Sequence, residues 1–188
     1  MSVPIEHLHR IYADSDDPWN FAESAYEQGK FRATAAALSR PHYAAALEIG
    51  CGNGALARHL APRCASYTGI DAVAKAIAAA RRALPNARFE QRFFPCPLPP
   101  GAFDLIIISE FLYFLSPPDI LDLAERIIRL WPDAELLCVS YLGDTGDQLS
   151  GEEALCHFIA ALAGRPRFET CRPAPGYRID RGLPEMRG

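Results

Sequence analysis

The sequence has little of what marks several specialised classes of protein. Its 188 residues contain no apolar run of the roughly 18 residues that a membrane-spanning helix needs, so we expect no membrane partner. Residues 1–10 lack the apolar core of a signal peptide, which favours a cytoplasmic protein. No internal repeat is visible, and the chain is long enough to bury a hydrophobic core as one domain.

Positive charge is scarce as well. The chain has 19 Lys and Arg against 23 Asp and Glu, a formal net charge of −4 at pH 7, and its arginines are scattered. Binding to nucleic acid requires clustered Lys and Arg that neutralise phosphates. We therefore expect no nucleic-acid partner.

Cysteine and histidine occur without the spacing that disulfide frameworks and metal sites show. The six cysteines include no C-x-x-C pair, and none of the five histidines stands in a cluster with carboxylates. We expect buried free thiols and no metal.

The strongest motif is E-I-G-C-G-N-G at Glu48–Gly54. A short apolar run leads into the first glycine and a helical pattern follows the last, so the glycines occupy a strand–turn–helix unit. Glycine has no Cβ and accepts positive φ, which lets the backbone approach a ligand closely. Asp71 ends the next apolar segment, where an acidic residue accepts the hydroxyl groups of a ribose. The pattern predicts binding of a nucleoside-bearing small molecule.

The rest of the chain alternates apolar runs with helical patterns. We expect helices at residues 5–12, 24–38, 55–60, 72–84, 118–130 and 150–163. Strands are expected at residues 44–49, 66–70, 87–92, 103–109, 136–141, 167–172 and 177–180, the last two as an antiparallel edge. The alternation predicts a doubly wound, Rossmann-like α/β fold with a mostly parallel, seven-stranded sheet and helices on both faces. We expect one domain, residues 1–188, with an N-terminal helical lid (1–43) packed on an α/β core (44–188).

The glycine motif alone is ambiguous. It fits the G-x-G-x-G of methyltransferases and also the G-x-G-x-x-A of dinucleotide-binding proteins. A dinucleotide fold usually begins with this unit, whereas about forty residues precede it here. The Y-x-x-x-K match at 26–30, typical of short-chain dehydrogenases, lies before the glycines rather than after them. Glu48 can receive the ammonium group of a methionine moiety but would repel a pyrophosphate.

Three features together resemble the class I S-adenosylmethionine-dependent methyltransferases: the glycine motif, Asp71, and F-D-L-I at 103–106. The resemblance covers roughly residues 40–142. Residues 17–34 and 109–115 also resemble a narrower branch, which contains the rhizobial nodulation N-methyltransferase that methylates the free amine of a chitooligosaccharide.

The resemblance implies the cofactor S-adenosyl-L-methionine and a set of contacts to it. Glu48 would orient the loop and the methionine end, Asp71 would bind the ribose hydroxyls, and Lys30 would hold the methionine carboxylate. An acidic residue that binds adenine in many relatives is replaced by Arg92, so the ring or the backbone amide of Phe93 would serve instead. The full set of expected cofactor-binding residues is Trp19, Lys30, Glu48, Gly50, Cys51, Gly52, Gly54, Asp71, Ala72, Arg92, Phe93 and Ser109.

Glu110 and Tyr113 are the candidate catalytic residues. Glu110 follows the fourth expected strand, and ligands of such sheets bind outside the carboxyl ends of the strands. A carboxylate there could take a proton from an amine acceptor, and Tyr141 and His157 could line the acceptor pocket. The Asn-Pro-Pro-Tyr signature of nucleic-acid methylation is absent after this strand. We therefore expect a small-molecule or sugar-type acceptor methylated at an amine nitrogen. An O-methyltransferase of a small metabolite and a non-catalytic nucleoside-binding protein are the alternatives.

Overall fold

A seven-stranded sheet organises the computed structural model, which describes residues 1–164 and 166–184. The strands lie in the order β3-β2-β1-β4-β5-β7-β6. Their bounds are Tyr43–Ile49 (β1), Cys64–Asp71 (β2), Arg88–Gln91 (β3), Leu105–Ser109 (β4), Glu135–Tyr141 (β5), Arg167–Pro173 (β6) and Tyr177–Leu183 (β7). Neighbouring strands from β3 to β5 pair in parallel, whereas β7 runs antiparallel to both β5 and β6. The Rossmann-like, mostly parallel sheet and its antiparallel edge are confirmed.

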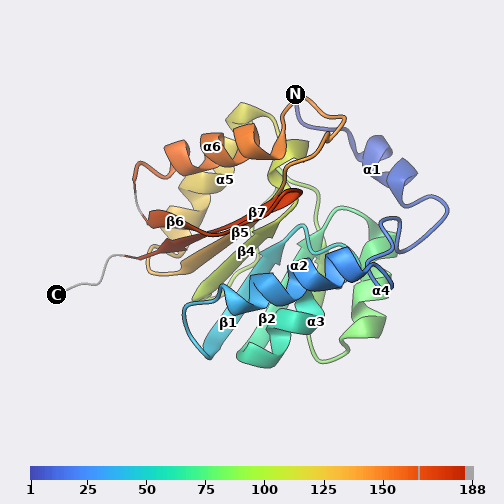
Figure 1. Cartoon of the computed structure of the whole chain (residues 1–188), viewed down its shortest axis with the longest axis horizontal. Coiled ribbons are helices and arrows are strands. Elements are labelled where there is room, and N and C mark those ends of the chain that lie inside the picture. Colours follow the sequence, from blue (N-terminus) through green and yellow to red (C-terminus); the bar gives the residue numbers. More distant parts are fainter. Residues whose placement is uncertain (165, 185–188) are drawn as a thin grey trace.

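Helices cover both faces of this sheet. Figure 1 shows α5 and α6 on one side and α2, α3 and α4 on the other. Their bounds are Ala25–Ala36 (α2), Ala57–Leu60 (α3), Ala74–Ala83 (α4), Pro117–Leu130 (α5) and Gly151–Ala161 (α6). Two short 3₁₀ helices, Ala61–Arg63 (η1) and Leu112–Phe114 (η2), follow α3 and precede α5.

Strand β4 explains why the core has two halves. Successive side chains of a strand point to opposite faces. Accordingly Ile106 and Ile108 belong to the apolar cluster under α5 and α6, whereas Leu105 and Ile107 belong to the cluster under α2, α3 and α4. All four are at most 1% exposed, as the unbroken apolar run of this segment predicts for a central strand.

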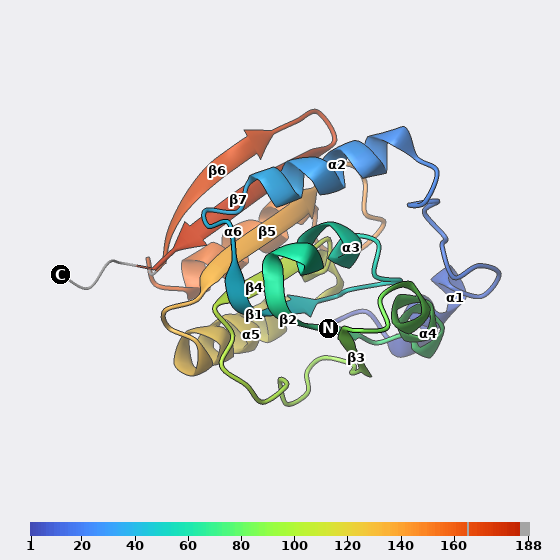
Figure 2. The same cartoon turned by 90° about the horizontal axis from the view of Figure 1, so that it is seen from below.

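The expected lid separates into two parts in the structure. Helix α2 packs on the core through the buried ring of Phe31, whereas α1 (Ile5–Ile11) buries none of its residues fully. Figure 2 shows α2 lying across the sheet and α1 at the far end of the molecule, beside α4. Helix α1 is attached at both ends: Val3 N donates to Phe114 O at 2.9 Å, and Lys75 Nζ donates to Tyr12 O at 3.0 Å.

Most expected elements lie where the sequence places them, and the starts of helices show why. Ser24 accepts a hydrogen bond from Glu27 N at the start of α2, and Ser150 forms a full capping box with Glu153 at the start of α6. Glu27 stands at the capping-box position of α2, but its carboxylate pairs with Lys30. Within the described residues no helix is long and apolar enough to cross a membrane.

Candidate active site

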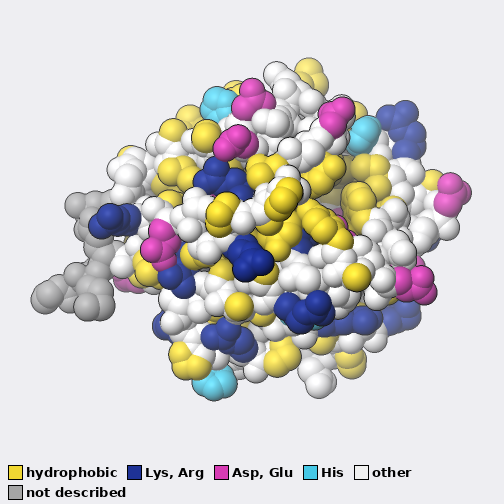
Figure 3. Space-filling view, in the orientation of Figure 1, with side chains coloured by type: hydrophobic (Ala, Val, Ile, Leu, Met, Phe, Trp, Pro, Cys, Tyr) yellow, Lys and Arg dark blue, Asp and Glu magenta, His cyan; other side chains and the backbone are white. Residues whose placement is uncertain are grey.

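A cavity of about 400 Å³ opens at the carboxyl ends of β1, β2 and β4. Residues of the glycine loop, the end of β2, the segment after β3, the segment after β4, helix α1 and the loop after β5 line it. Figure 3 shows hydrophobic side chains gathered around a hollow near the middle of one face. The position agrees with the rule that ligands of doubly wound sheets bind where the strands end.

The glycine loop supplies one wall of the cavity. Gly50, Gly52 and Gly54 have φ values of +80°, +51° and +80°, a region that other residues rarely adopt. Gly50 and Gly52 line the cavity, whereas Gly54 is not among the described lining residues. A Cβ at Gly54 would lie 3.1 Å from the Cβ of Ala80 on α4. Gly54 therefore permits close packing of the loop on a helix, and the structure does not bring it to the expected ligand.

Asp71 lies beside this wall at the end of β2. Its Oδ2 accepts a hydrogen bond of 2.9 Å from Gly52 N, and its Oδ1 accepts one of 2.9 Å from Val73 N. Burial raises the pKa of Asp71, and the hydrogen bonds from backbone amides oppose that rise. A carboxylate has about four acceptor positions, so this one can still receive hydroxyl groups from the cavity.

Glu48 also lines the cavity but is almost completely enclosed. It is 1% exposed, and its Oε2 accepts a hydrogen bond of 2.8 Å from the hydroxyl group of Tyr67. Burial raises the pKa of Glu48 to about 8, so the carboxyl group is mostly protonated at neutral pH. A neutral carboxyl group can orient the loop, but it attracts a methionine ammonium group less strongly than the sequence suggests.

The segment after β3 forms the expected adenine end. Ala72, Arg92 and Phe93 line the cavity there, as does Cys51 from the glycine loop. The guanidinium group of Arg92 donates to Glu90 Oε2 at 2.6 and 2.8 Å and to the carbonyl oxygen of Pro97. Arg92 is thus engaged within its own loop, whereas Phe93 is 41% exposed and offers a ring face.

Trp19, in the segment between α1 and α2, forms another part of the cavity wall. It lines the cavity and is 44% exposed. Its ring stacks on Phe21 at a centroid distance of 5.4 Å and meets the ring of Tyr12 edge-on at 5.5 Å. Trp19 is therefore held in place while one side of its indole remains free to cover a ligand.

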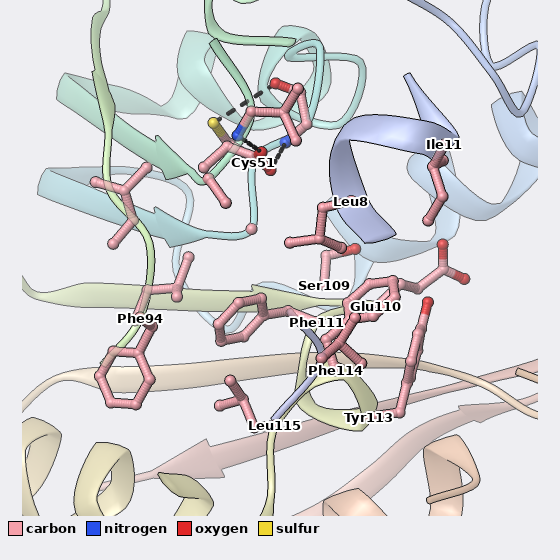
Figure 4. Close-up of a pocket in the computed structure, with 18 of the residues that line it drawn as sticks. Leu8, Ile11, Cys51, Phe94, Ser109, Glu110, Phe111, Tyr113, Phe114 and Leu115 are labelled. Atoms are coloured by element: carbon pink, nitrogen blue, oxygen red, sulfur yellow. Dashed lines mark hydrogen bonds between the residues drawn. The ribbon is translucent and has the colours of Figure 1, made fainter. Parts of the chain in front are cut away.

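The segment after β4 places the two candidate catalytic residues. Ser109 ends the strand, and Glu110 follows it with a φ of +50°. The backbone amide of Glu110 donates a hydrogen bond of 2.8 Å to Val139 O. Glu110 and Tyr113 both line the cavity, and Figure 4 shows the phenol of Tyr113 pointing toward the Glu110 carboxyl group. Burial raises the pKa of both residues; for Glu110 the nearby Lys30 ammonium opposes the rise.

Lys30 has different partners from those the sequence suggests. Its side chain is 2% exposed, and Nζ lies 2.6 Å from Glu110 Oε1 and 2.7 Å from Glu27 Oε2. Lys30 is not among the described lining residues of the cavity. This geometry does not support the expected contact between Lys30 and a methionine carboxylate, because the Lys30 ammonium group already pairs with two carboxylates of the chain.

The structure adds residues from α1 and from the loop after β5. Helix α1 contributes His7, Leu8 and Ile11, and the loop after β5 contributes Asp144, Thr145 and Asp147. Tyr141, at the end of β5, lines the cavity where the sequence analysis expects it. His7 Nε2 lies 4.0 Å from Asp147 Oδ1. The helical spacing of apolar residues in α1 is a sequence signal that could have pointed to this part of the cavity. No local sequence pattern marks the loop after β5 as part of it. His157 is exposed on α6 and is not among the described lining residues, so its expected place in the acceptor pocket is corrected.

Comparison with solved structures and sequences defines the class and the family. The N-methyltransferase NodS from Bradyrhizobium japonicum WM9, solved with S-adenosyl-L-homocysteine, superposes with a TM-score of 0.79 at 22% identity over 96% of this chain and 97% of that one. A putative methyltransferase from Pseudomonas syringae superposes with a TM-score of 0.69 at 31% identity over 85% of this chain and 99% of that one. With the sheet order and the glycine-lined cavity, these define a class I S-adenosylmethionine-dependent methyltransferase.

The family follows from sequence. The family model described as Nodulation protein S (NodS) matches residues 4–142. Nodulation protein S of Sinorhizobium fredii is 36% identical over 166 residues, which cover 84% of this chain and 70% of the relative. The chain belongs to the NodS family.

Proposed function

We propose that this chain transfers the methyl group of S-adenosyl-L-methionine to an amine nitrogen of a small-molecule or sugar-type acceptor. One observation carries the proposal: a single cavity joins the glycine loop and Asp71 at one end to the Glu110 carboxyl group at the other. A cofactor site and a proton acceptor thus share one cavity. The similarity to an N-methyltransferase supports nitrogen as the acceptor atom.

The residues present fit the cofactor. A Cβ added at Gly50 would lie 2.8 Å from the Cβ of Phe111, so this wall admits only glycine. The Asp71 carboxylate has free acceptor capacity for the ribose hydroxyls, and Phe93 and Trp19 present ring faces. Ser109, at the end of β4, completes the floor between the two ends.

The sulfonium group, when bound, supplies an activated methyl group that needs an aligned nucleophile rather than a covalent enzyme intermediate. The chain's own task is then to hold the amine in line and to remove its proton. An amine attacks through its lone pair, so a protonated acceptor first gives a proton to Glu110. As the new N–C bond forms, the S–C bond breaks with its electron pair moving to sulfur. Tyr113, beside Glu110, can hydrogen-bond the same nitrogen.

The charges around the acceptor end favour a basic substrate. Glu110 and Asp147 lie near Tyr113 in this part of the cavity, Asp144 also lines the cavity, and His7 of α1 lies 4.0 Å from Asp147. Such a wall attracts an ammonium group and repels carboxylates and phosphates. This polarity favours amine over anionic acceptors, and over the O-methylation that remains the alternative.

We also propose that residues 1–188 act as one methyltransferase domain, with 1–43 closing over the core, and that the protein works in the cytoplasm. The seven described strands form one sheet, and helices α2 to α6 cover its two faces, which supports the first statement.

A labelled methyl-transfer assay tests the proposal. We expect label from S-adenosyl-L-[methyl-¹⁴C]methionine to enter glucosamine or a chitosan tetramer, and not the matching compounds in which hydroxyl replaces amine. Glu110→Gln should lower kcat by about 10²-fold, the range of a lost acid–base group, and leave the affinity for S-adenosyl-L-homocysteine within about threefold. Transfer to hydroxyl compounds alone would favour the O-methyltransferase, and binding without any transfer would favour a nucleoside-binding protein.

A further inference from the structure

Lys30 lies where an ammonium group is costly unless it is paired. Its side chain is 2% exposed on α2, and burial favours the neutral amine. Glu27 at 2.7 Å and Glu110 at 2.6 Å provide the compensating charges. With all three groups ionised, this carboxylate–ammonium–carboxylate cluster has a net charge of −1.

The cluster joins two parts of the chain that are 80 residues apart in sequence. Glu27 and Lys30 lie one turn apart on α2, and Glu110 follows β4. Of the three, only Glu110 is among the described residues that line the cavity. Lys30 therefore contacts the cavity through the carboxylate that it holds.

The backbone of Glu110 shows that this carboxylate is held in a defined place. A φ of +50° is unusual for a residue other than glycine, so surrounding contacts must maintain it. The hydrogen bond that Glu110 N donates to Val139 O fixes the main chain, and the Lys30 ammonium group fixes the carboxylate.

We propose that Lys30 is a positioning residue for catalysis, which holds the Glu110 carboxylate at the acceptor end of the cavity and keeps it ionised, with Glu27 anchoring the ammonium group from behind. The inference rests on the proposed role of Glu110 as proton acceptor. It replaces the direct contact between Lys30 and the cofactor that the sequence suggests.

The charges around Glu110 determine in which direction its pKa should move when a partner is removed. Among the described residues, Lys30, Glu27 and Tyr26 of α2 and Tyr113 of η2 interact electrostatically with Glu110 or with Lys30, and Asp147 and Tyr141 interact with Tyr113. Burial raises the pKa of Glu110, Lys30 lowers it, and Glu27 raises it. Loss of the ammonium group should therefore move the Glu110 titration to higher pH, and loss of the Glu27 charge should move it to lower pH.

The experiment measures that titration directly. Protein labelled with ¹³C at the Glu δ-carboxyl carbons and saturated with S-adenosyl-L-homocysteine is titrated by NMR, and the Glu110 signal is assigned by its absence in Glu110→Gln. We expect the Glu110 titration to move up by about one pH unit or more in Lys30→Met, down in Glu27→Gln, and little in Lys30→Arg. Arg178→Met, which removes an ion pair with Asp180 on β7, is the matched control and should leave the titration unchanged.

The kinetic readout uses the chitosan tetramer as acceptor. In Lys30→Met we expect kcat at pH 7 to fall about tenfold with the affinity for S-adenosyl-L-homocysteine within about threefold, and the acid limb of the pH–rate profile to move with the Glu110 signal. A tenfold loss of affinity for S-adenosyl-L-homocysteine with an unchanged Glu110 titration would overturn the inference. Lys30 would then be assigned to cofactor binding. If Lys30→Met does not fold, Glu27→Gln decides, because an upward or absent shift contradicts the proposal. If the wild-type protein methylates no amine, the proposed function fails while the NMR titration still decides the role of Lys30.

Discussion

The hydroxyl group of Tyr67 donates a hydrogen bond of 2.8 Å to Glu48, the acidic residue that precedes the glycine loop. Both side chains are buried on neighbouring parallel strands, with Glu48 on β1 and Tyr67 on β2. The bond ties the first strand of the cofactor site to the second. Because Glu48 is enclosed, its charge state is coupled to the stability of the whole sheet.

We expect Glu48 to make the protein less stable as the pH rises toward 8. A carboxyl group in the unfolded chain ionises near pH 4.5, whereas Glu48 in the folded chain ionises near 8. The folded state therefore binds an extra proton between these values, and the stability that it provides is complete below pH 4.5 and lost as the pH rises through 8. Each pKa unit corresponds to about 1.4 kcal/mol. Glu48→Gln should flatten the fall in Tm between pH 5 and 8, and Glu23→Gln, at an exposed position, should not.

The Asp71 carboxylate should determine the affinity for the cofactor. Asp71→Ala removes the acceptors of the ribose hydroxyls and leaves the Gly52 amide without its bond. Because hydrogen bonds to charged groups contribute about 1.5–3 kcal/mol, we expect at least tenfold weaker binding of S-adenosyl-L-homocysteine by calorimetry. Asp16→Ala, which breaks only an exposed ion pair with Arg82, is the control. An unchanged affinity in Asp71→Ala would refute the ribose assignment.

Substitutions at two glycines of the loop should have different effects: Gly54→Ala should lower stability, and Gly52→Ala should weaken cofactor binding. In Gly54→Ala the new methyl group meets Ala80 at 3.1 Å in a strained φ region, so we expect a loss of about 1–2 kcal/mol in urea unfolding. The folded fraction should still bind S-adenosyl-L-homocysteine normally. Gly52→Ala places its methyl group on the cavity wall, 3.2 Å from the Tyr12 hydroxyl, and should weaken binding. Equal effects of both variants on affinity would contradict this division.

Trp19 should report cofactor binding by fluorescence. The chain has two tryptophans. Trp19 lines the cavity, whereas Trp131 is 7% exposed at the end of α5 and bonds to the carbonyl oxygen of Gly101. We expect S-adenosyl-L-homocysteine to change the emission of the wild-type protein and of Trp131→Phe, but not of Trp19→Phe. A signal that survives in Trp19→Phe would show that Trp19 does not cover the ligand.

The fold could be predicted because its signals are local. The unbroken apolar run of β4, the capping serines and the prolines between elements each act within a few residues, and the structure places the elements accordingly. Most boundaries differ by a residue or two. Helix α3 begins at Ala57 rather than at residue 55, and β7 extends three residues further than expected, to Leu183.

The candidate site could be predicted only in part, for the same reason. Gly52 and Asp71 meet because adjacent parallel strands end together, which the sequence pattern implies. The pairing of Lys30 with Glu110 depends on how α2 crosses the sheet, and no local pattern encodes that. The burial that neutralises Glu48 likewise comes from the packed strands rather than from its neighbours in sequence.

Helix α1 has a kinetic consequence for the enzyme. Its two attachments, at Val3 and at Tyr12, consist of a few hydrogen bonds, and its side chains roof the space in which both reaction products are left. Because these side chains form part of the cavity wall, release of either attachment would widen the route by which the products leave.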